Sequence, residues 1–210
     1  FGETIRPRPT PLPNPARTRL AELLAYRQQL IDEIAQRTPQ AYRFTDPTLK
    51  RRAEDHLDRL RQDRDDLAAE IAATLQTDPD FAPLARILTS FKGVGPILAA
   101  TLIAHLPELG SLDDKQVACL VGLAPFARDS GSLRGKRMIQ GGRAHIRRVL
   151  YVAALAAIRY NPVIHAFQQR LAARHKPGKV AVVACMRKII VILNAMAKSR
   201  TPWMPPAPSA

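Results

Sequence analysis

The sequence predicts an all-α protein in which a long helical hairpin precedes a compact helical domain. Three observations support this fold class. Apolar residues recur at helical spacing along most of the chain. Alternating strand patterns are almost absent, and the place for a small β-hairpin lies within residues 126–141. Proline, glycine and aspartate separate the apolar segments where helices are expected to begin and end.

The N-terminal part of the chain predicts a linker followed by two long helices. Residues 1–15 are rich in proline and are expected to form an extended linker. Residues 17–36 place leucine and isoleucine on one helical face, which Arg27 interrupts. A second helix is expected to begin at Pro47, with Asp46 as its N-cap.

The second helix carries a heptad pattern. Steps of four and three residues define a mostly apolar seam, interrupted by Arg64 and Thr74, at positions 53, 57, 60, 64, 67, 71 and 74. Residues 16–80 are therefore expected to form a helical hairpin or coiled coil. We expect this unit to join copies of the chain into a homo-oligomer; a plain hairpin without such contacts fits the pattern equally well.

The compact domain is expected to span residues 84–200 and to begin with two helices around the turn "KGVGP". The two glycines permit positive φ and a close approach of the backbone, and Pro96 suits the first turn of a helix. This pattern is similar to a helix-hairpin-helix motif, whose turn presents backbone N–H groups to a DNA phosphate. An ordinary turn between two helices is the alternative. The predicted DNA- or RNA-binding residues of the turn are Lys92, Gly93, Val94 and Gly95.

Four more helices are expected downstream of this motif. The first lies between Ser111 and Gly122, and the others are Arg143–Tyr160, Pro162–Arg174 and Lys179–Lys198. Residues 201–210, which are rich in proline, are expected to form a disordered tail.

Charge is distributed unevenly along the chain. The net charge is +14, yet residues 1–85 hold 13 basic and 14 acidic residues, whereas residues 86–210 hold 19 basic and 4 acidic residues. A basic region beside a neutral one predicts a polyanionic partner, most often nucleic acid. A basic surface that serves solubility alone is the less favoured interpretation.

The sequence also bears on location. No apolar run reaches the roughly 18 residues that span a bilayer, and the first residues lack the apolar core of a signal peptide. Cys119 and Cys185 both lie in apolar sequence and are expected to be reduced, buried thiols. We therefore expect a cytoplasmic protein without a membrane partner. Because the chain does not begin with Met, we also expect it to be a fragment or a processed product.

The segment "FARDSGSLRGKRMIQGGRAHIRRVLY" gathers cations around two serines and four glycines. Guanidinium groups bind phosphate oxygens bidentately, so we predict nucleic-acid contacts here. The predicted binding residues are Arg128, Arg134, Lys136, Arg137, Arg143, Arg147 and Arg148.

Two functions fit this segment when its residues are considered alone. Ser130 precedes a glycine, which leaves room for a phosphate, and nearby cations would stabilise the charge that develops if its hydroxyl attacks phosphorus. The other interpretation is a basic nucleic-acid-binding loop without catalysis. The carboxylates of the basic half are too few to predict a metal site, and Asp113 and Asp114 are better explained as charges at a helix N-terminus.

Several segments resemble one class of insertion-sequence transposases. They are "GVGPILAATLIAHLPELG", "LVGLAPFARDSGSLRGKRMIQGGRAHIRRVLYVAALAA", "NPVIHAFQQRL" and "KVAVVACMRKIIVILNAM". The resemblance covers roughly residues 84–203 and is most specific from Gly122 to Ala157. In this class an N-terminal RuvC-like domain with a DEDD carboxylate set precedes a coiled coil and a serine-bearing transposase domain.

The resemblance implies a bacterial, nucleoid-associated enzyme for DNA transposition and recombination, guided by a bridge RNA. Its catalytic serine forms a covalent link to the cut strand, and Ser130 in "GLAPFARDSG" matches that position better than Ser132. No cofactor is expected in this chain; Mg²⁺ is expected in the RuvC-like domain, which matches nothing here. The chain is accordingly expected to be the C-terminal part of the enzyme. A non-catalytic helix-hairpin-helix DNA-binding module and a structural oligomerisation subunit are the alternatives.

Overall fold

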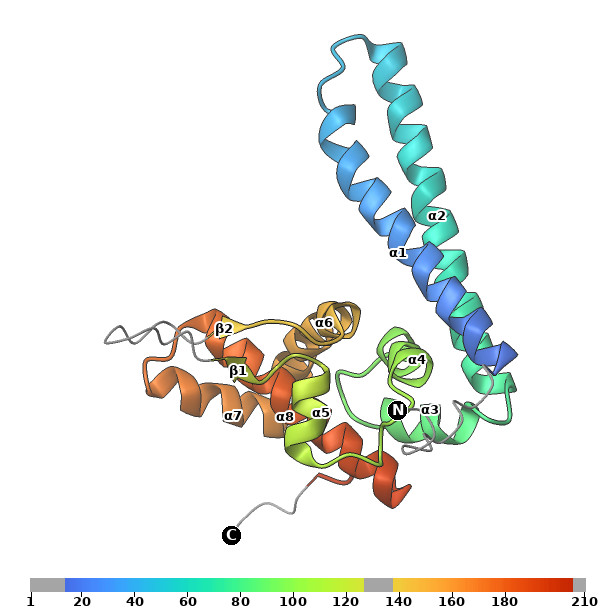
Figure 1. Cartoon of the computed structure of the whole chain (residues 1–210). Coiled ribbons are helices and arrows are strands. Elements are labelled where there is room, and N and C mark those ends of the chain that lie inside the picture. The colour runs from blue at the N-terminus through green and yellow to red at the C-terminus, as the bar shows by residue number, and fades with distance from the viewer. Residues whose placement is uncertain (1–13, 127–137, 206–210) are drawn as a thin grey trace, which may run out of the picture.

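The computed structural model describes residues 14–126 and 138–205, and its described part is all-helical apart from one pair of very short strands (Figure 1). The side chains of Asn14, Asp46, Asp113 and Asn161 cap four of the described helices. The helices are α1 (Pro15–Ala41), α2 (Pro47–Thr77), α3 (Ala82–Thr89), α4 (Pro96–His105), α5 (Asp114–Leu120), α6 (Ala144–Tyr160), α7 (Pro162–Ala173) and α8 (Gly178–Ser199).

Helices α1 and α2 form an antiparallel hairpin that projects from the rest of the chain, which we call the body (Figure 1). Asp46 caps α2 as predicted: its side chain accepts hydrogen bonds from the N–H groups of Thr48 and Leu49. The seam of α2 buries Leu57, Leu60 and Ile71 within the hairpin. The seam ends at Leu75 rather than Thr74, because Leu75 is 3% exposed and Thr74 turns its hydroxyl back to the carbonyl of Glu70.

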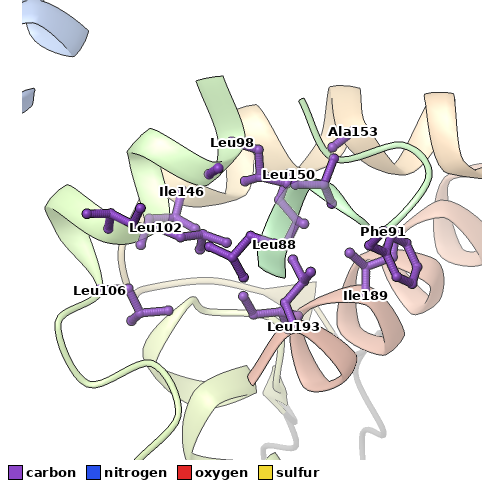
Figure 2. Packing of buried hydrophobic residues seen from close by; sticks show 14 of the residues in the cluster. Leu88, Phe91, Leu98, Leu102, Leu106, Ile146, Leu150, Ala153, Ile189 and Leu193 are labelled. Carbon is purple, nitrogen blue, oxygen red and sulfur yellow. The ribbon is translucent and has the colours of Figure 1, made fainter. Parts of the chain in front are cut away.

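The body buries one continuous core between α3, α4, α6 and α8, and the lower parts of α1 and α2 join it through Leu20 and Ile71. Figure 2 shows Leu88 and Leu102 facing Leu150 and Leu193 across this core. Helix α4 is the most deeply buried, with every residue from Leu98 to Ala104 inaccessible to solvent or nearly so. This burial fixes the N-terminus of α4, and with it the "KGVGP" turn, relative to α6.

A minimal β-hairpin is present where the sequence leaves room for one. Strand β1 (Pro125–Phe126) pairs antiparallel with β2 (Met138–Ile139), with Pro125 opposite Ile139. Residues 127–137, which lie outside the described residues, connect these two strands in the sequence.

The C-terminal segment differs from the expected disordered tail over residues 201–205. The Trp203 ring packs edge-on against Phe91, with centroids 4.9 Å apart, and the Trp203 N–H donates to Ser90 Oγ at 2.7 Å. These contacts of a large aromatic side chain hold Trp203 against the body.

Helix α8 is apolar enough to resemble a membrane span. Its mean hydropathy over an 18-residue window is 2.0, but 44% of that window is buried inside the body, as expected for a core helix. The buried Asn194 fits this role, because it accepts from the Gly110 N–H and donates to the Leu112 carbonyl, both at 2.8 Å. Cys185 is buried in α8, whereas Cys119 is exposed on α5, contrary to the expectation that both thiols are buried.

Candidate nucleic-acid interface

The turn before α4 presents an open helix N-terminus. Gly95 is the N-cap of α4 and has no side-chain cap, so the first N–H groups of the helix lack an internal acceptor. A Cβ placed on Gly95 would meet no atom within 4 Å, and its φ of −95° is accessible to any residue. The space in front of Gly95 can therefore admit a phosphate oxygen, as the predicted helix-hairpin-helix contact requires.

Gly93 serves the fold rather than an open approach to a ligand. Its φ is +107°, and a Cβ there would lie 2.6 Å from the Cβ and 2.7 Å from the Cα of Ala157 in α6. Asn161 fastens the same turn, because its buried side chain donates to the Lys92 carbonyl at 3.3 Å while capping α7. Gly93 thus allows the turn to pack directly against α6.

Val94 also faces inward. It is 6% exposed, and its N–H donates to the Phe91 carbonyl at 2.9 Å. Because this N–H already has an internal partner, we leave Val94 out of the phosphate contacts that the sequence predicts. Lys92 is exposed at the surface of the turn, so Lys92 and Gly95 remain the residues of the turn that can reach a ligand.

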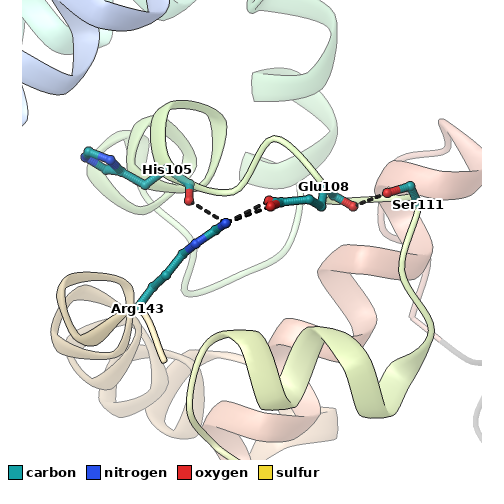
Figure 3. A network of polar contacts seen from close by, with 4 residues as sticks. All are labelled: His105, Glu108, Ser111 and Arg143. Atoms are coloured by element: carbon teal, nitrogen blue, oxygen red, sulfur yellow. Dashed lines mark hydrogen bonds and ion pairs between the residues drawn. The ribbon is translucent and has the colours of Figure 1, made fainter. Parts of the chain in front are cut away.

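Arg143 has a structural partner that the sequence did not reveal. Its guanidinium binds the Glu108 carboxylate through both terminal nitrogens, at 2.6 and 2.7 Å, and donates to the His105 carbonyl at 2.8 Å (Figure 3). The hydrogen bonds from Arg143 hold the pKa of Glu108 below its ordinary value, and Glu108 raises the pKa of Arg143. The pair fixes the start of α6 to the end of α4, so we expect Arg143 to serve the fold rather than to make the predicted DNA contact.

Arg147 is also committed to the fold. Its Nη1 donates to the Val121 carbonyl at 3.0 Å and to the Gly141 carbonyl. These bonds join the loop after α5 to the loop before α6, where Gly122 and Gly142 pack backbone against backbone. Gly122 and Gly142 therefore let two loops approach each other.

Arg148 is the predicted cation of α6 that remains available. It is exposed, and it lines a groove with Gly93 and Gly95 on one side and α1 on the other. We call this the α1–α6 groove; it encloses about 480 Å³, and its lining includes Arg27, Ile31, Gly95, Arg148, Val152 and Ala156. The sequence did not predict Arg27 as a binding residue, although its position on the apolar face of α1 was a signal.

Exchanging Arg143 and Arg148 for glutamine separates the two roles. Arg143→Gln should lower the free energy of unfolding by about 1–2 kcal/mol, because a partly buried charged hydrogen bond is lost. Its DNA affinity at a temperature where it is folded should stay that of the unmodified chain. Arg148→Gln should leave the free energy of unfolding unchanged and weaken DNA binding. It should also reduce the slope of log affinity against log salt by about one. Urea denaturation and fluorescence anisotropy with a DNA duplex measure both. A loss of DNA affinity in folded Arg143→Gln would contradict the structural role.

Two histidines meet beside the Arg143–Glu108 pair. The rings of His105 and His145 lie 4.4 Å apart in an edge-to-face arrangement. Burial lowers the pKa of His105, with His145 and then Arg143 adding to the effect. Burial, Arg143 and Arg148 lower the pKa of His145. The folded chain therefore favours two neutral imidazoles.

Stability should fall as the solution becomes mildly acidic. Because both pKa values lie below the ordinary 6.5, the unfolded chain binds these protons first as pH falls, and unfolding is favoured below that value. The stabilising contribution of the Glu108 carboxylate, whose ordinary pKa is 4.5, is lost only in a lower pH range. Thermal unfolding between about pH 7.5 and 5.5 measures the effect, and His145→Gln should flatten the profile. An equally steep profile in that variant would show that other groups cause it.

Several predicted site residues lie outside the described residues. They are Arg128, Ser130, Arg134, Lys136 and Arg137, all within residues 127–137. The sequence places them between β1 and β2, and α6 begins shortly after β2. Among the residues that the structure does describe, no three His, Cys, Asp or Glu side chains gather as a metal site would require.

Comparison with known proteins identifies this part of the chain. Residues 85–169 match the family model described as Transposase IS116/IS110/IS902 family. The match covers the "KGVGP" turn, α4 to α6 and most of α7, together with the segment that contains Ser130.

Curated relatives point the same way. An uncharacterised 43.6 kDa protein of insertion element IS110 from Streptomyces coelicolor is 31% identical over 144 residues, which is 68% of this chain and 35% of that protein. An uncharacterised 42 kDa protein of insertion element IS900 from Mycobacterium paratuberculosis is 32% identical over 133 residues, 60% of this chain and 32% of that protein. The pilin gene-inverting protein of Moraxella bovis is 25% identical over 138 residues, 64% of this chain and 43% of that protein.

The chain spans about a third of the length of the two insertion-element proteins. Residues 85–169, with the open turn of α4, the Arg143–Glu108 pair and the segment around Ser130, thus match a transposase domain of the IS116/IS110/IS902 family.

Proposed function

We propose that this chain is the C-terminal part of a DNA transposase or recombinase that binds DNA and a guide RNA and supplies a serine nucleophile. The observation that carries the proposal is the transposase-domain match over residues 85–169, which fall in the basic part of the chain. The name of the Moraxella relative, a gene-inverting protein, refers to rearrangement of DNA. A cytoplasmic, nucleoid-associated location follows from this function.

Phosphate binding is supported by the charges that remain unpaired in the fold. Of the 4 acids in residues 86–210, Glu108 is bound to Arg143 and Asp113 caps α5 with its side chain. Lys92 and Arg148 are exposed near the open N-terminus of α4. Contacts of this kind hold the sugar–phosphate backbone of any sequence and orient the strand without reading bases.

Ser130 is the proposed nucleophile. Its Oγ would give up its proton and form a bond to phosphorus, the bond from phosphorus to the leaving oxygen would break, and the leaving oxygen would take up a proton, so that no net proton is gained or lost. Arg128, Arg134, Lys136 and Arg137 are close in sequence and would neutralise charge at the attacked phosphate. The RuvC-like domain would contribute carboxylates and the Mg²⁺ that they hold, which assist departure of the leaving oxygen.

The hairpin is proposed to join copies of the chain. The apolar seam of α2 is used within the hairpin, but Tyr42, Phe44 and Leu49 at its tip remain 76%, 43% and 47% exposed. Exposed aromatic and leucine side chains at the end of a projecting element can pack against a second copy. Oligomerisation would bring a RuvC-like domain of one copy to the serine of another.

A non-catalytic helix-hairpin-helix module is the second candidate, and the open Gly95 turn favours it independently of Ser130. Both candidates require DNA binding, which a purely structural oligomerisation subunit does not. Trapping of covalent protein–DNA adducts distinguishes the two DNA-binding candidates.

DNA binding by the 210-residue chain tests the proposal. A footprint of about four phosphates should weaken binding roughly 150-fold between 50 and 200 mM salt, because each neutralised phosphate releases counterions. The chain alone should neither cut nor join strands, with or without magnesium, because the proposed site lacks its carboxylates. Anisotropy titrations and denaturing gels measure these outcomes. Binding that ignores salt, or strand cleavage by this chain alone, would contradict the proposal.

A further inference from the structure

The α1–α6 groove has the size and the walls of a small-ligand site. Its volume of about 480 Å³ lies within the range of pockets that bury small molecules. Ile31 of α1 and Val152 and Ala156 of α6 line it, so much of its wall is aliphatic. Its described lining includes no aspartate or glutamate, and an anion would therefore meet no repulsion there.

Two arginines face this groove from opposite walls. Arg27 comes from α1, and its Nε is fully buried without a hydrogen-bond partner among the described residues. Arg27 is therefore a cation whose donors are incompletely satisfied, and an anion in the groove would be attracted by its charge. Arg148 comes from α6 and is exposed, with no ion pair to a described residue.

The surroundings of Arg27 disfavour its positive charge, so a bound anion would stabilise it. Burial lowers the pKa of Arg27, and the nearby Arg64 lowers it further, against a smaller opposite effect of Asp65. Asp65 is itself held by both the Nε and Nη2 of Arg64, at 2.9 Å each. The carboxylate whose charge acts on Arg27 is thus already bound to another arginine.

A third feature lies at the mouth of the groove. Gly95 lines it, and the uncapped N-terminus of α4 opens in front of Gly95. The groove therefore combines an aliphatic slot with phosphate-binding groups at its edge: two guanidiniums and a helix N-terminus.

We propose that the α1–α6 groove binds a single unstacked nucleotide of a DNA or RNA strand. Its phosphate contacts Arg27, Arg148 and the N-terminus of α4, and its base lies against Ile31, Val152 and Ala156. This inference rests on the proposed nucleic-acid binding and adds a mode of contact to it: the hairpin becomes one wall of the site. Aliphatic walls offer no pattern of donors and acceptors, so the groove should accept different bases.

A duplex with one bulged 2-aminopurine tests the groove directly, because this base fluoresces strongly when it is unstacked. The 210-residue chain should raise the fluorescence severalfold and should bind the bulged duplex more tightly than a fully paired duplex of equal length. Bulged DNA and bulged RNA are tested separately. A response to either one supports the proposal and identifies the type of strand.

Ala156→Leu fills the groove without changing charge. It should abolish the fluorescence rise and the preference for the bulge while leaving affinity for the paired duplex unchanged. Ala172→Leu, on the exposed face of α7 outside the groove, is the matched control and should behave like the unmodified chain. Circular dichroism verifies that each variant is folded.

A second pair of variants keeps the test independent of packing. Val152 is 64% exposed and lines the groove, whereas Leu155 is 45% exposed on the same helix and does not line it. Val152→Glu should abolish the fluorescence rise by placing a carboxylate on the aliphatic wall against which the base is proposed to lie. Leu155→Glu, which has the same net charge, should retain it.

The outcomes separate this inference from the proposed function. If the paired duplex binds with strong salt dependence but the bulge gives neither tighter binding nor fluorescence, the nucleotide site is refuted and the proposed function stands. If neither duplex binds, the proposed function itself fails. If Ala156→Leu alters self-association in sedimentation but no nucleic-acid signal, the groove accommodates a second protein chain instead, which also refutes the inference.

Discussion

Gly93→Ala is expected to disrupt the body of this protein, whereas Gly95→Ala is expected to fold normally and lose DNA affinity. The Gly93 position has a φ of +107° and leaves 2.6 Å between an added Cβ and the Cβ of Ala157. Backbone strain and overpacking together should cost about 2–5 kcal/mol, a large part of the stability of a domain this size. Thermal unfolding followed by circular dichroism measures the loss.

Gly95→Ala is the control for this result and also tests the turn as a phosphate site. An added methyl at Gly95 meets no atom of the protein within 4 Å, so stability should change little. The methyl would occupy the space in front of the first N–H groups of α4, and affinity for duplexes of any sequence should fall alike. A loss confined to one sequence would argue against backbone recognition, and an unchanged melting temperature in Gly93→Ala would contradict the packing described for that turn.

Ser130→Ala should abolish strand cleavage and recombination by the longer transposase of which this chain is proposed to be a part. Removal of the nucleophile of a covalent mechanism typically lowers the rate by roughly 10³-fold or more. The change removes one oxygen and no charge, so DNA affinity should stay unchanged. Recombination assays and anisotropy measure the two effects. Ser132→Ala is the matched control and should retain activity; the opposite pattern would assign the chemistry to Ser132.

The boundaries of α6, α7 and α8 could be predicted from the sequence because their causes are local, whereas α1, expected over residues 17–36, extends from Pro15 to Ala41. The helices predicted at Arg143–Tyr160, Pro162–Arg174 and Lys179–Lys198 each lie within one residue of α6, α7 and α8 at both ends. Asn161 explains this success: it ends α6 and caps α7 through the N–H groups of Val163 and Ile164. A proline directly after a capping residue is a signal that depends on neighbouring residues only.

The roles of individual cations could not be predicted in the same way. Arg143 and Glu108 are 35 residues apart, and nothing local distinguishes Arg143 from Arg148. The distinction arises only when packing places the start of α6 beside the end of α4. Gly93 and Gly95 differ for the same reason, since α6 covers the first and leaves the second open.

The sequence shows that Arg27 is unusual but does not indicate what it contacts. An arginine on the apolar face of α1 is unusual, and the structure places it in the groove that lies between α1 and α6. Trp203 is a similar case within a proline-rich segment, because its partner Phe91 is distant in sequence. Both positions depend on tertiary contacts that no periodicity encodes.

The proposed mechanism requires a covalent bond between Ser130 and DNA. The longer transposase would be incubated with magnesium, its guide RNA and a DNA substrate that loses a short strand on cleavage, so that the covalent intermediate accumulates. After denaturation and digestion, mass spectrometry of the peptides locates the attached nucleotide. We expect a nucleotide phosphate attached to Ser130, and no such adduct in the Ser130→Ala variant. Strand exchange without any adduct, or an adduct on another residue, would contradict it.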